Sequence, residues 1–438
     1  MPVSSAQPVS VALVGLGTIG TGVVRLFQEN SALLQQRLGF PLELSAIADI
    51  DLKTDRGLDL SSYRLMGDWK EAVADPEVDV VIELVGGTGI AREIVLGALT
   101  AGKAVVPAHQ ALLAAHGGEI YRAADAGSSE IAFEASVAGT IPVLRALREG
   151  LCADRIDSIH GIVNGTCNYI LTEMERAGEP YAACLERAQD LGYAEADPTL
   201  DVDGTDSAHK LAILLGLGLG AEVSPDQIST EGIESVDAVD IEYAGQFGLR
   251  IKLLAVAKLA GGSVEARVHP TMIPAQSVLA GVDGSMNAVG VCGRLSGPTI
   301  YYGAGAGSLP TASAVVADVM ELARAKRRGA FGRVPPLGTT QLQSLPLRPL
   351  SELEGEYYLR FSVLDRPGML SAVTGALGEH GISIASLLQP EQSESAAVPV
   401  VIMTHGAKEA SLRAALAQIA DRAGLASSAQ VIRIERDL

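Results

Sequence analysis

The sequence predicts an α/β protein with three folded parts: a doubly wound parallel sheet at the N-terminus, an α+β middle region and a C-terminal βαββαβ domain. Three observations support this prediction. A strand-like run, Val9–Val14, leads directly into a glycine-rich turn and a helical pattern. Strand and helix patterns then alternate up to residue 106, which is typical of parallel sheets with crossover helices. After a proline-rich stretch, the pattern restarts as β, α, β, β, α, β between residues 357 and 435, the order of a split βαβ domain.

The glycine-rich turn reads Gly15-Leu-Gly17-Thr-Ile-Gly20. Between a strand and a helix, this spacing is the fingerprint of a dinucleotide-binding site. The first glycine permits the tight turn, the second lets the backbone approach a pyrophosphate, and the third lets the helix pack closely. Thr18 and Ile19 lie at the start of that helix, whose amides would face the phosphates. A glycine-rich turn that binds nothing is the alternative, and the flanking strand and helix favour binding.

The second strand, Leu42–Ala48, ends at Asp49. An acidic side chain at this position can accept a hydrogen bond from the ribose 2′-hydroxyl of NAD. Lys53 and Arg56 follow closely, and either could instead meet the 2′-phosphate of NADP. The sequence therefore leaves NAD and NADP open, with a slight preference for NAD.

Composition excludes several classes of partner and location. The formal charge of −19 over 438 residues argues against nucleic acid or an anionic membrane as a partner. The chain has no long apolar run and no basic N-terminal region, so we expect neither a membrane span nor a signal peptide. Four widely spaced cysteines form no CxxC pair, which fits a reduced, cytoplasmic protein without a disulfide framework or structural zinc; they are Cys152, Cys167, Cys184 and Cys292.

An acidic stretch, Gly192–Lys210, places several carboxylates in front of one lysine. Its turn-rich part leads into an apolar run, which predicts a loop followed by a helix with Asp203 or Thr205 as the N-cap. On that helix Asp206 and Lys210 are four residues apart and share a face. An acidic pocket with one directed ammonium suits a small cationic substrate and a proton transfer. A solvated acidic loop with a surface ion pair is the alternative.

Cys167 suggests a different chemistry. It lies in Ile159–Tyr169, which looks like a strand that ends in a polar turn and starts a helix. A nucleophilic cysteine here would form a thioester, as in acylating aldehyde dehydrogenases. We favour a small buried cysteine, because no histidine in the sequence is marked as its base.

Five segments, in order and over residues 9–330, resemble the homoserine dehydrogenase family: GLGTIGTGVV, FEASVAGTIP, NGTCNYI, LGYAEADPTLDVDGTDSAHKLAIL and YYGAGAGSLPTASAV. From Tyr357 onward the chain resembles an ACT domain, so the whole chain is similar to the long, allosteric form of the enzyme. The resemblance implies reversible, NAD(P)-dependent interconversion of L-aspartate 4-semialdehyde and L-homoserine, a step of threonine and methionine biosynthesis.

The resemblance also implies roles for residues of the acidic stretch. Lys210 matches the proton donor to the aldehyde oxygen, and Asp206 matches the carboxylate that orients this lysine. Glu195 matches the residue that binds the substrate amino group, with Asp201 in the same pocket. A lysine, whose reference pKa is about 10.4, starts charged near neutral pH, as a donor should. Homoserine oxidation should therefore have a more alkaline optimum than semialdehyde reduction.

Several coenzyme contacts follow from the same resemblance. Gly165, Gly192 and Gly305 match positions where backbone approaches the nicotinamide half of the coenzyme. The chain departs from the family where Gln110 replaces a lysine beside coenzyme and substrate and His109 replaces an asparagine. A glutamine keeps hydrogen bonding but loses the positive charge. This departure motivates a further alternative, an amino-acid-sensing relative without turnover.

A structural sodium site is implied as well, formed by Glu134 and the backbone of Val137, Gly139 and Ile141. Carbonyl oxygens plus one carboxylate suit a hard cation. The local pattern predicts Glu134 at the end of a strand and Pro142 at the start of a helix.

We expect four segments: a dinucleotide-binding domain over 1–135, to which helix 311–330 returns, a catalytic and dimerisation domain over 136–310, a linker over 331–355 and an ACT domain over 356–438. The resemblance implies a homodimer or homotetramer.

ACT domains bind amino acids at the turn between first strand and first helix. That position corresponds to Asp365, Gly368 and Met369, with Ser383 nearby. By family analogy the effector would be L-threonine, acting as a feedback inhibitor. A structural ACT domain that binds nothing is the alternative.

Overall fold

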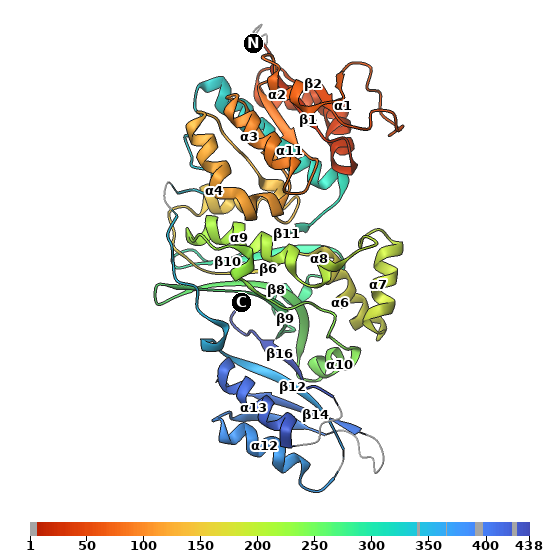
Figure 1. Ribbon diagram of the computed structural model, residues 1–438, viewed down its shortest axis with the longest axis vertical. Helices are drawn as coiled ribbons and strands as arrows, with labels where there is room; N and C mark the ends of the chain where they lie inside the picture. The colour runs from red at the N-terminus through yellow and green to blue at the C-terminus, as the bar shows by residue number, and fades with distance from the viewer. Residues whose placement is uncertain (1–6, 340–341, 365, 390–396, 423–426) are drawn as a thin grey trace. The chain divides into compact units, whose positions relative to one another are not determined.

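The computed structural model describes residues 7–339, 342–364, 366–389, 397–422 and 427–438. These residues form two compact units, each assembled from separate stretches of chain. The first unit comprises Met1–Gly165, Asp206–Ile228 and Met286–Leu345, and the second comprises Thr166–Thr205, Ser229–Ser285 and Pro346–Leu438. Figure 1 labels their helices and strands.

A five-stranded parallel sheet in the order β3-β2-β1-β4-β5 lies at the centre of the first unit. Its strands are β1 (Val9–Val14), β2 (Leu42–Ala48), β3 (Arg64–Met66), β4 (Val80–Glu83) and β5 (Ala104–Pro107). Strands β4 and β5 are fully buried, as expected for a parallel sheet covered on both faces. The strand order changes direction between β1 and β4, the point where doubly wound sheets bind ligands. The predicted doubly wound sheet is therefore confirmed.

The helices of this sheet are α1 (Thr18–Leu38), α2 (Trp69–Ala74), α3 (Ile90–Thr100), α4 (Gln110–Ala126) and α11 (Ser308–Arg328). Helix α11 returns from far along the chain, as predicted, and shares a core with β1 and α1. Gly22 permits this approach, because a Cβ there would lie 2.7 Å from the Ser308 hydroxyl. The return of α11 closes one face of the nucleotide-binding sheet.

The segment after residue 131 differs from the sequence-based expectation. Ile131 forms only an isolated bridge with Val105, and Glu134 begins a 3-10 turn, η1 (Glu134–Ser136), so the predicted strand is wrong. A short helix, α5 (Val143–Arg145), follows Pro142 and continues into a π turn, η2 (Ala146–Gly150). The chain turns early because the Glu134 carboxylate accepts the amides of Leu144 and Arg145 at the start of α5.

Three further strands of the first unit are antiparallel: β10 (Met286–Gly293) pairs with β6 (Ile156–Ile162) and with β11 (Gly297–Ala304). Helix α9 (Thr205–Leu219) is apolar along most of its length. Its Gly218 lies against Ile159 of β6, where a Cβ would be 2.7 Å from the isoleucine side chain. A 3-10 turn, η3 (Pro225–Gln227), follows α9.

The second unit contains a long hairpin, β8 (Leu249–Ala260) and β9 (Ser263–Pro274), with all twelve residues of β8 in register. The short strand β7 (Ser229–Thr230) runs parallel to β9. Its remaining elements before residue 285 are α6 (Gly165–Ala177), α7 (Tyr181–Asp190), α8 (Thr199–Val202), α10 (Ala238–Gln246) and η4 (Leu279–Gly281).

The C-terminal part of the second unit has the predicted βαββαβ order. After η5 (Leu350–Glu352) come β12 (Glu354–Leu364), α12 (Met369–Glu379), β13 (Ile384–Leu388), β14 (Ala397–Thr404), β15 (Ala407–Lys408), α13 (Glu409–Arg422) and β16 (Gln430–Ile434). Its sheet has the order β16-β12-β14-β13. Strand β16 also pairs in parallel with β9, where Arg433 lies opposite Thr271 and Ile434 opposite Met272. The C-terminal sheet therefore continues into the β8–β9 hairpin.

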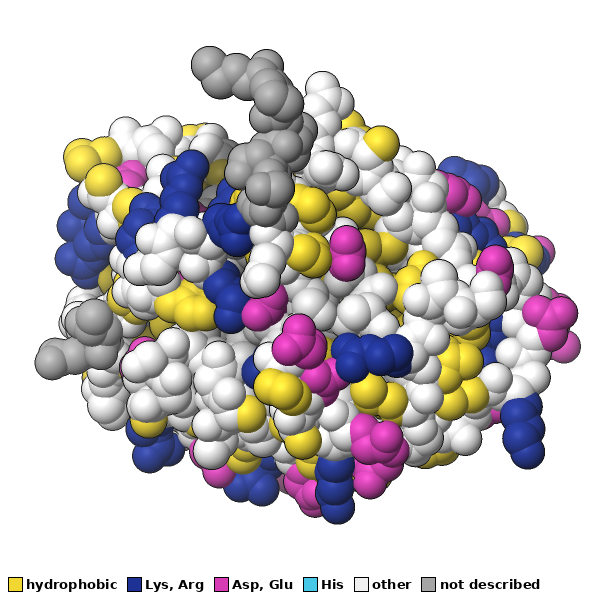
Figure 2. Space-filling view, turned by 90° about the horizontal axis from the view of Figure 1, so that it is seen from above, with side chains coloured by type: hydrophobic (Ala, Val, Ile, Leu, Met, Phe, Trp, Pro, Cys, Tyr) yellow, Lys and Arg dark blue, Asp and Glu magenta, His cyan; other side chains and the backbone are white. Residues whose placement is uncertain are grey.

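The surface carries both signs of charge. Figure 2 shows acidic, basic and apolar side chains intermixed on the face that it displays. Within the described ranges, no helix has the length and the hydropathy that crossing a bilayer requires.

Candidate active site

Asp206 is the centre of a buried hydrogen-bond cluster in the first unit. Its Oδ1 accepts Nε2 of Gln110 at 2.8 Å, and its Oδ2 accepts Nδ2 of Asn164 at 2.9 Å and Nζ of Lys210 at 2.6 Å. The donors come from the start of α4, the turn after β6 and the second turn of α9. Asp206 itself lies in the first turn of α9, where the helix dipole favours a negative charge. These contacts fix both carboxylate oxygens.

Lys210 shares a helix face with Asp206, as the four-residue spacing predicts. Only 14% of its side chain is exposed, so the alternative of a surface ion pair is wrong. Its ammonium also donates to the Val163 carbonyl at 2.8 Å. An ammonium has three N–H donors, and these two acceptors orient it. A substrate oxygen placed at the third donor would meet a positioned general acid.

His109 precedes α4 and adds an imidazole beside this pair. Burial lowers the pKa of His109 below its ordinary value of 6.5, although hydrogen bonding to Gln110 and the charge of Asp206 oppose the shift. The ring is therefore neutral at neutral pH.

The glycine-rich turn opens onto a cavity of about 580 Å³ beside β1, β2 and β4. Gly15 has φ of +101° and touches the Leu84 backbone, and a Cβ on Gly20 would collide with the Gly15 carbonyl. No atom outside its own chain neighbours lies within 4 Å of the Cβ position of Gly17. Gly15 thus allows the tight turn, Gly20 allows α1 to pack closely against it, and Gly17 leaves room for a ligand. Thr18 and Ile19 begin α1 at the same turn.

The cavity has acidic and basic side chains at its edge. Asp49 accepts the amides of Leu16 and Asp51, which fixes its carboxylate at the end of β2. Arg56 pairs with Asp51 at 3.3 Å and lines the same cavity, together with Trp69, the single tryptophan of the chain. Asp49, expected to favour NAD, and Arg56, expected to favour NADP, thus both line this cavity.

Glu83 at the end of β4 is a residue that the sequence analysis missed. It is fully buried, and its Oε1 accepts the amides of Val85 and Gly86 at 2.7 and 3.2 Å. Burial raises its pKa. The carboxyl group shapes the turn that contributes Leu84 and Val85 to the cavity. The available signal was an acidic residue at the end of an otherwise apolar strand.

Gly305, a predicted coenzyme glycine, and Gly139, predicted as part of the cation site, pack tightly against each other in the first unit. A Cβ on Gly305 would collide with the Asn287 side chain, and one on Gly139 would collide with the Gly305 backbone. Gly139 has φ of +57°, a conformation that glycine adopts readily. Gly165 begins α6 directly after Asn164, so it lies next to a residue that donates a hydrogen bond to Asp206.

Glu134, the carboxylate assigned to the expected cation site, caps the start of a helix. Both oxygens of Glu134 cap the start of α5, at 2.8 Å from the Leu144 amide and 2.9 Å from the Arg145 amide. Its own amide donates to Asp318 at 2.7 Å. Over the part of the chain that the structure describes, no cluster of three His, Cys, Asp or Glu side chains could hold a metal.

The remaining residues of the acidic stretch belong to the second unit. Glu195 is exposed, and its carbonyl accepts Nε2 of Gln189 at 3.1 Å. Gly192 makes a left-handed turn after α7, with φ of +74°. Asp201 lies half-buried in α8, and its carbonyl accepts the thiol of Cys167 at 3.1 Å. Because Cys167 is fully buried, it lacks the access that a nucleophilic cysteine needs.

The predicted effector turn lies between β12 and α12. Gly368 has φ of +93° and directly precedes α12, which Met369 opens. The Ser383 carbonyl accepts the His405 amide at 2.9 Å. Asp365 lies outside the described residues.

Three family models match the chain. They are described as homoserine dehydrogenase over residues 142–320, homoserine dehydrogenase NAD binding domain over 15–134, and ACT domain over 357–424. The chain is 44% identical to the homoserine dehydrogenase of Neisseria gonorrhoeae over 415 residues, which cover 94% of this chain and 95% of that protein.

Solved structures show the same similarity. A homoserine dehydrogenase from Thiobacillus denitrificans superposes with a TM-score of 0.93 at 42% identity, over 98% of this chain and 99% of that one. A hyperthermophilic archaeal homoserine dehydrogenase in complex with NADPH superposes with a TM-score of 0.61 at 25% identity, over 77% of this chain and 100% of that one.

Proposed function

Because this chain belongs to the homoserine dehydrogenase family, we propose that it interconverts L-aspartate 4-semialdehyde and L-homoserine with NAD or NADP. The observation that carries this proposal is the buried Asp206–Lys210 pair at 2.6 Å. It lies in the same unit as the coenzyme cavity of about 580 Å³. An oriented ammonium and a nicotinamide are what reduction of an aldehyde requires.

In the proposed mechanism, a coenzyme bound at the glycine-rich turn would supply a hydride to the aldehyde carbon in reduction and would accept it from the carbinol carbon in oxidation. Lys210 stabilises the negative charge that develops on the aldehyde oxygen and then donates its proton to it. Asp206 and the Val163 carbonyl hold the ammonium in place. Glu195 and Asp201 would bind the substrate amino group. In the oxidation of homoserine, Lys210 takes the hydroxyl proton back.

The choice of coenzyme depends on the edge of the cavity. The fixed carboxylate of Asp49 can accept a ribose 2′-hydroxyl, whereas Arg56 can donate to a 2′-phosphate. The archaeal relative was solved with NADPH. We propose that the chain accepts both coenzymes, through these two residues.

The direct test is reduction of aspartate semialdehyde by the purified protein with NADH and with NADPH. Lys210→Ala should abolish turnover, while coenzyme binding, followed by energy transfer from Trp69, stays within about twofold of wild type. The control is Lys408→Ala, an exposed lysine in the C-terminal domain. Full turnover by Lys210→Ala would contradict the assignment. A folded wild-type protein that binds coenzyme without turnover would instead favour the sensing relative suggested by Gln110.

Feedback regulation through the C-terminal domain is the second part of the proposal. The match to the ACT family and the left-handed turn at Gly368 support an amino-acid site at the start of α12. We propose L-threonine as the effector and a homodimer or homotetramer as the assembly. Inhibition of turnover by millimolar L-threonine tests the proposed effector. Light scattering of the purified protein tests the proposed assembly. We also propose a cation bound to the backbone carbonyls of residues 137–141, for which the family resemblance is the sole support.

Contacts within the second unit supply a route for this regulation. Arg433 of β16 pairs with Glu231, which directly follows β7. Two residues on, the Ile233 amide donates to the Val202 carbonyl at 2.9 Å, at the end of the helix that carries Asp201. Gly232 packs against the same carbonyl, where a Cβ would collide with it. A shift of β16 would therefore be transmitted to a predicted substrate-binding helix.

A further inference from the structure

Gln110 connects two parts of the first unit that are distant in sequence. It is the first residue of α4, only three residues after the end of β5 in the nucleotide-binding sheet. Its Nε2 reaches Oδ1 of Asp206 at 2.8 Å, across 96 positions of sequence. Asp206 and Lys210 stand on α9. The side-chain amide of Gln110 therefore connects α9, which carries Asp206 and Lys210, to the start of α4 next to the end of β5.

We propose that Gln110 is a positioning residue that aligns the Asp206–Lys210 pair with the nucleotide-binding sheet. This inference rests on the proposed dehydrogenase function. It assigns to Gln110 a task that acts through Asp206 and requires no contact with the substrate.

The geometry of the carboxylate explains why this amide matters. Oδ2 of Asp206 already accepts Asn164 and Lys210, whereas Oδ1 accepts the amide of Gln110. With donors on both oxygens, the carboxylate plane has one orientation. Without the Gln110 donor the plane can rotate, and Oδ2 then no longer holds the Lys210 ammonium in one place.

The chemistry makes the position of that ammonium critical. Hydride is exchanged at the aldehyde carbon and the proton at its oxygen, and these two atoms lie only about 1.2 Å apart. Hydride donor and proton donor must therefore be aligned to well below that distance. A misplacement of about 1 Å can cost a factor of about one hundred in rate. The hydrogen bond from Gln110, which lies just after β5, to Asp206 on α9 provides such alignment.

The test uses substitutions at one position. Gln110→Met keeps the size of the side chain but cannot donate, so a packing role would be preserved and a positioning role lost. We expect kcat to fall by about 10- to 100-fold. The KM for homoserine and the coenzyme affinity seen by Trp69 should stay within about threefold, and the solvent deuterium isotope effect on kcat should increase because proton transfer becomes slower. Gln110→Lys regains a donor and should recover most of the lost turnover.

Gln246→Met is the matched control, because Gln246 also donates to a carboxylate, Glu242, but both lie on the exposed face of α10. It should behave as wild type. A second measurement does not depend on turnover: trace acetylation of Lys210, read by peptide mass spectrometry against Lys408, should be faster in Gln110→Met. A side chain that is held less firmly presents its uncharged amine, the form that reacts, to the reagent more often.

The outcomes separate the two proposals. An inactive wild type that still shows faster Lys210 acetylation in Gln110→Met would refute the proposed function and keep the positioning role. Wild-type kinetics together with unchanged acetylation in Gln110→Met would overturn the positioning role and leave the function in place.

Discussion

The guanidinium of Arg433 in β16 meets the carboxylate of Glu231 through two hydrogen bonds of 2.9 Å. The same guanidinium donates to Glu409 of α13 at 3.0 and 2.9 Å. Arg433 and Glu409 are almost fully buried, and pairing with the two carboxylates raises the pKa of Arg433 despite its burial. The last strand and the second helix of the C-terminal domain are thus joined to the segment after β7 by one arginine.

The first prediction concerns Glu231, the more exposed partner of Arg433. Removing Arg433 would take one charged partner away from the buried Glu409, which Arg413 and Tyr357 also contact, and would destabilise the fold. Glu231, whose side chain is 38% exposed, is therefore the better site. Glu231→Gln should raise the threonine concentration for half-inhibition by about fivefold, the size of a typical coupling energy. Its uninhibited kcat should stay close to wild type. Glu242→Gln, at an exposed position of α10, is the control, and an unchanged threonine response in Glu231→Gln would refute this route.

The second prediction concerns pH. In the proposed mechanism, reduction consumes the proton of Lys210 and oxidation needs this side chain as an amine, so the optimum for homoserine oxidation should be more alkaline than that for semialdehyde reduction. Burial lowers the pKa of His109 below 6.5, so its ring does not titrate in the alkaline range. Initial rates from pH 6.5 upward in both directions are the measurement. Superimposable profiles would remove Lys210 from the role of proton carrier.

The third prediction concerns coenzyme preference. Arg56→Gln should weaken NADPH binding by about tenfold, the loss expected for a hydrogen bond to a charged group, and should change NADH binding little. Energy transfer from Trp69 gives both dissociation constants directly. Arg64→Gln, which removes an arginine paired with Asp75 away from the cavity, is the matched control. Equal losses for the two coenzymes in Arg56→Gln would exclude recognition of the 2′-phosphate by this residue.

Much of the site follows from short-range patterns. The turn at Gly15 and the pair formed by Asp206 and Lys210 each lie within six residues, so helix periodicity and backbone sterics determine them. The same applies to the βαββαβ order of the C-terminal domain. These features were predicted correctly because local sequence carries the physical constraint.

The missed features depend on segments that are distant in sequence. The contact of Gln110 with Asp206 and the pairing of β16 with β9 arise only when the chain is folded. Glu134 was expected to end a strand, yet its carboxylate accepts two amides at the start of the next helix. An unpaired buried carboxylate is costly, and satisfying it outweighs the local preference for a strand.

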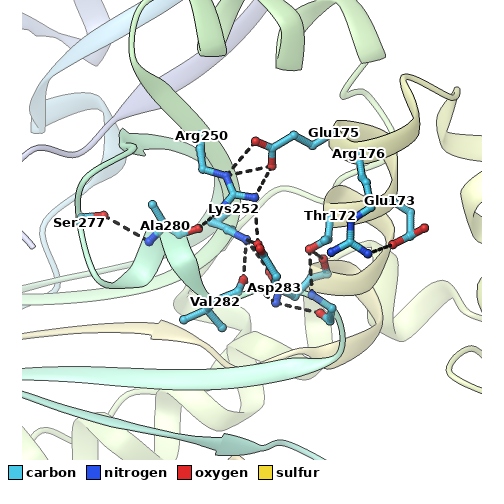
Figure 3. Close-up of polar contacts among 12 residues, drawn as sticks. Thr172, Glu173, Glu175, Arg176, Arg250, Lys252, Ser277, Ala280, Val282 and Asp283 are labelled. Atoms are coloured by element: carbon cyan, nitrogen blue, oxygen red, sulfur yellow. Dashed lines mark hydrogen bonds and ion pairs between the residues drawn. The ribbon is translucent and has the colours of Figure 1, made fainter.

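A buried lysine in the second unit leads to the last prediction. Figure 3 shows Lys252 pointing toward the loop around Val282 and Asp283. Its ammonium donates to the Val282 carbonyl and to Asn168 Oδ1 at 3.2 Å, and it lies 3.3 Å from Asp283. Burial, together with the charge of Arg250, lowers the pKa of Lys252 to about 8, although Asp283 and Glu175 act in the opposite direction.

The sign of the effect follows from proton linkage. Between pH 8 and about 10.5, the unfolded chain binds a proton at Lys252 that the folded chain has lost, so the free energy of unfolding should rise with pH in this window. Below pH 8 the cost of burying the charge is fully present. The gain is at most about 3 kcal/mol, because one pKa unit corresponds to about 1.4 kcal/mol. It should be absent in Lys252→Met, which keeps the length of the side chain without the charge.

Urea unfolding at pH 8, 9 and 10 measures this directly, as the difference between wild type and Lys252→Met at each pH. Taking the difference cancels the other lysines and tyrosines, which titrate in both proteins. Lys53→Met, in an exposed loop of the first unit, should leave the pH dependence unchanged. If the difference between wild type and Lys252→Met stays constant from pH 8 to 10, Lys252 keeps its proton when folded, and the hydrogen bonds to Val282, Asn168 and Asp283 outweigh its burial.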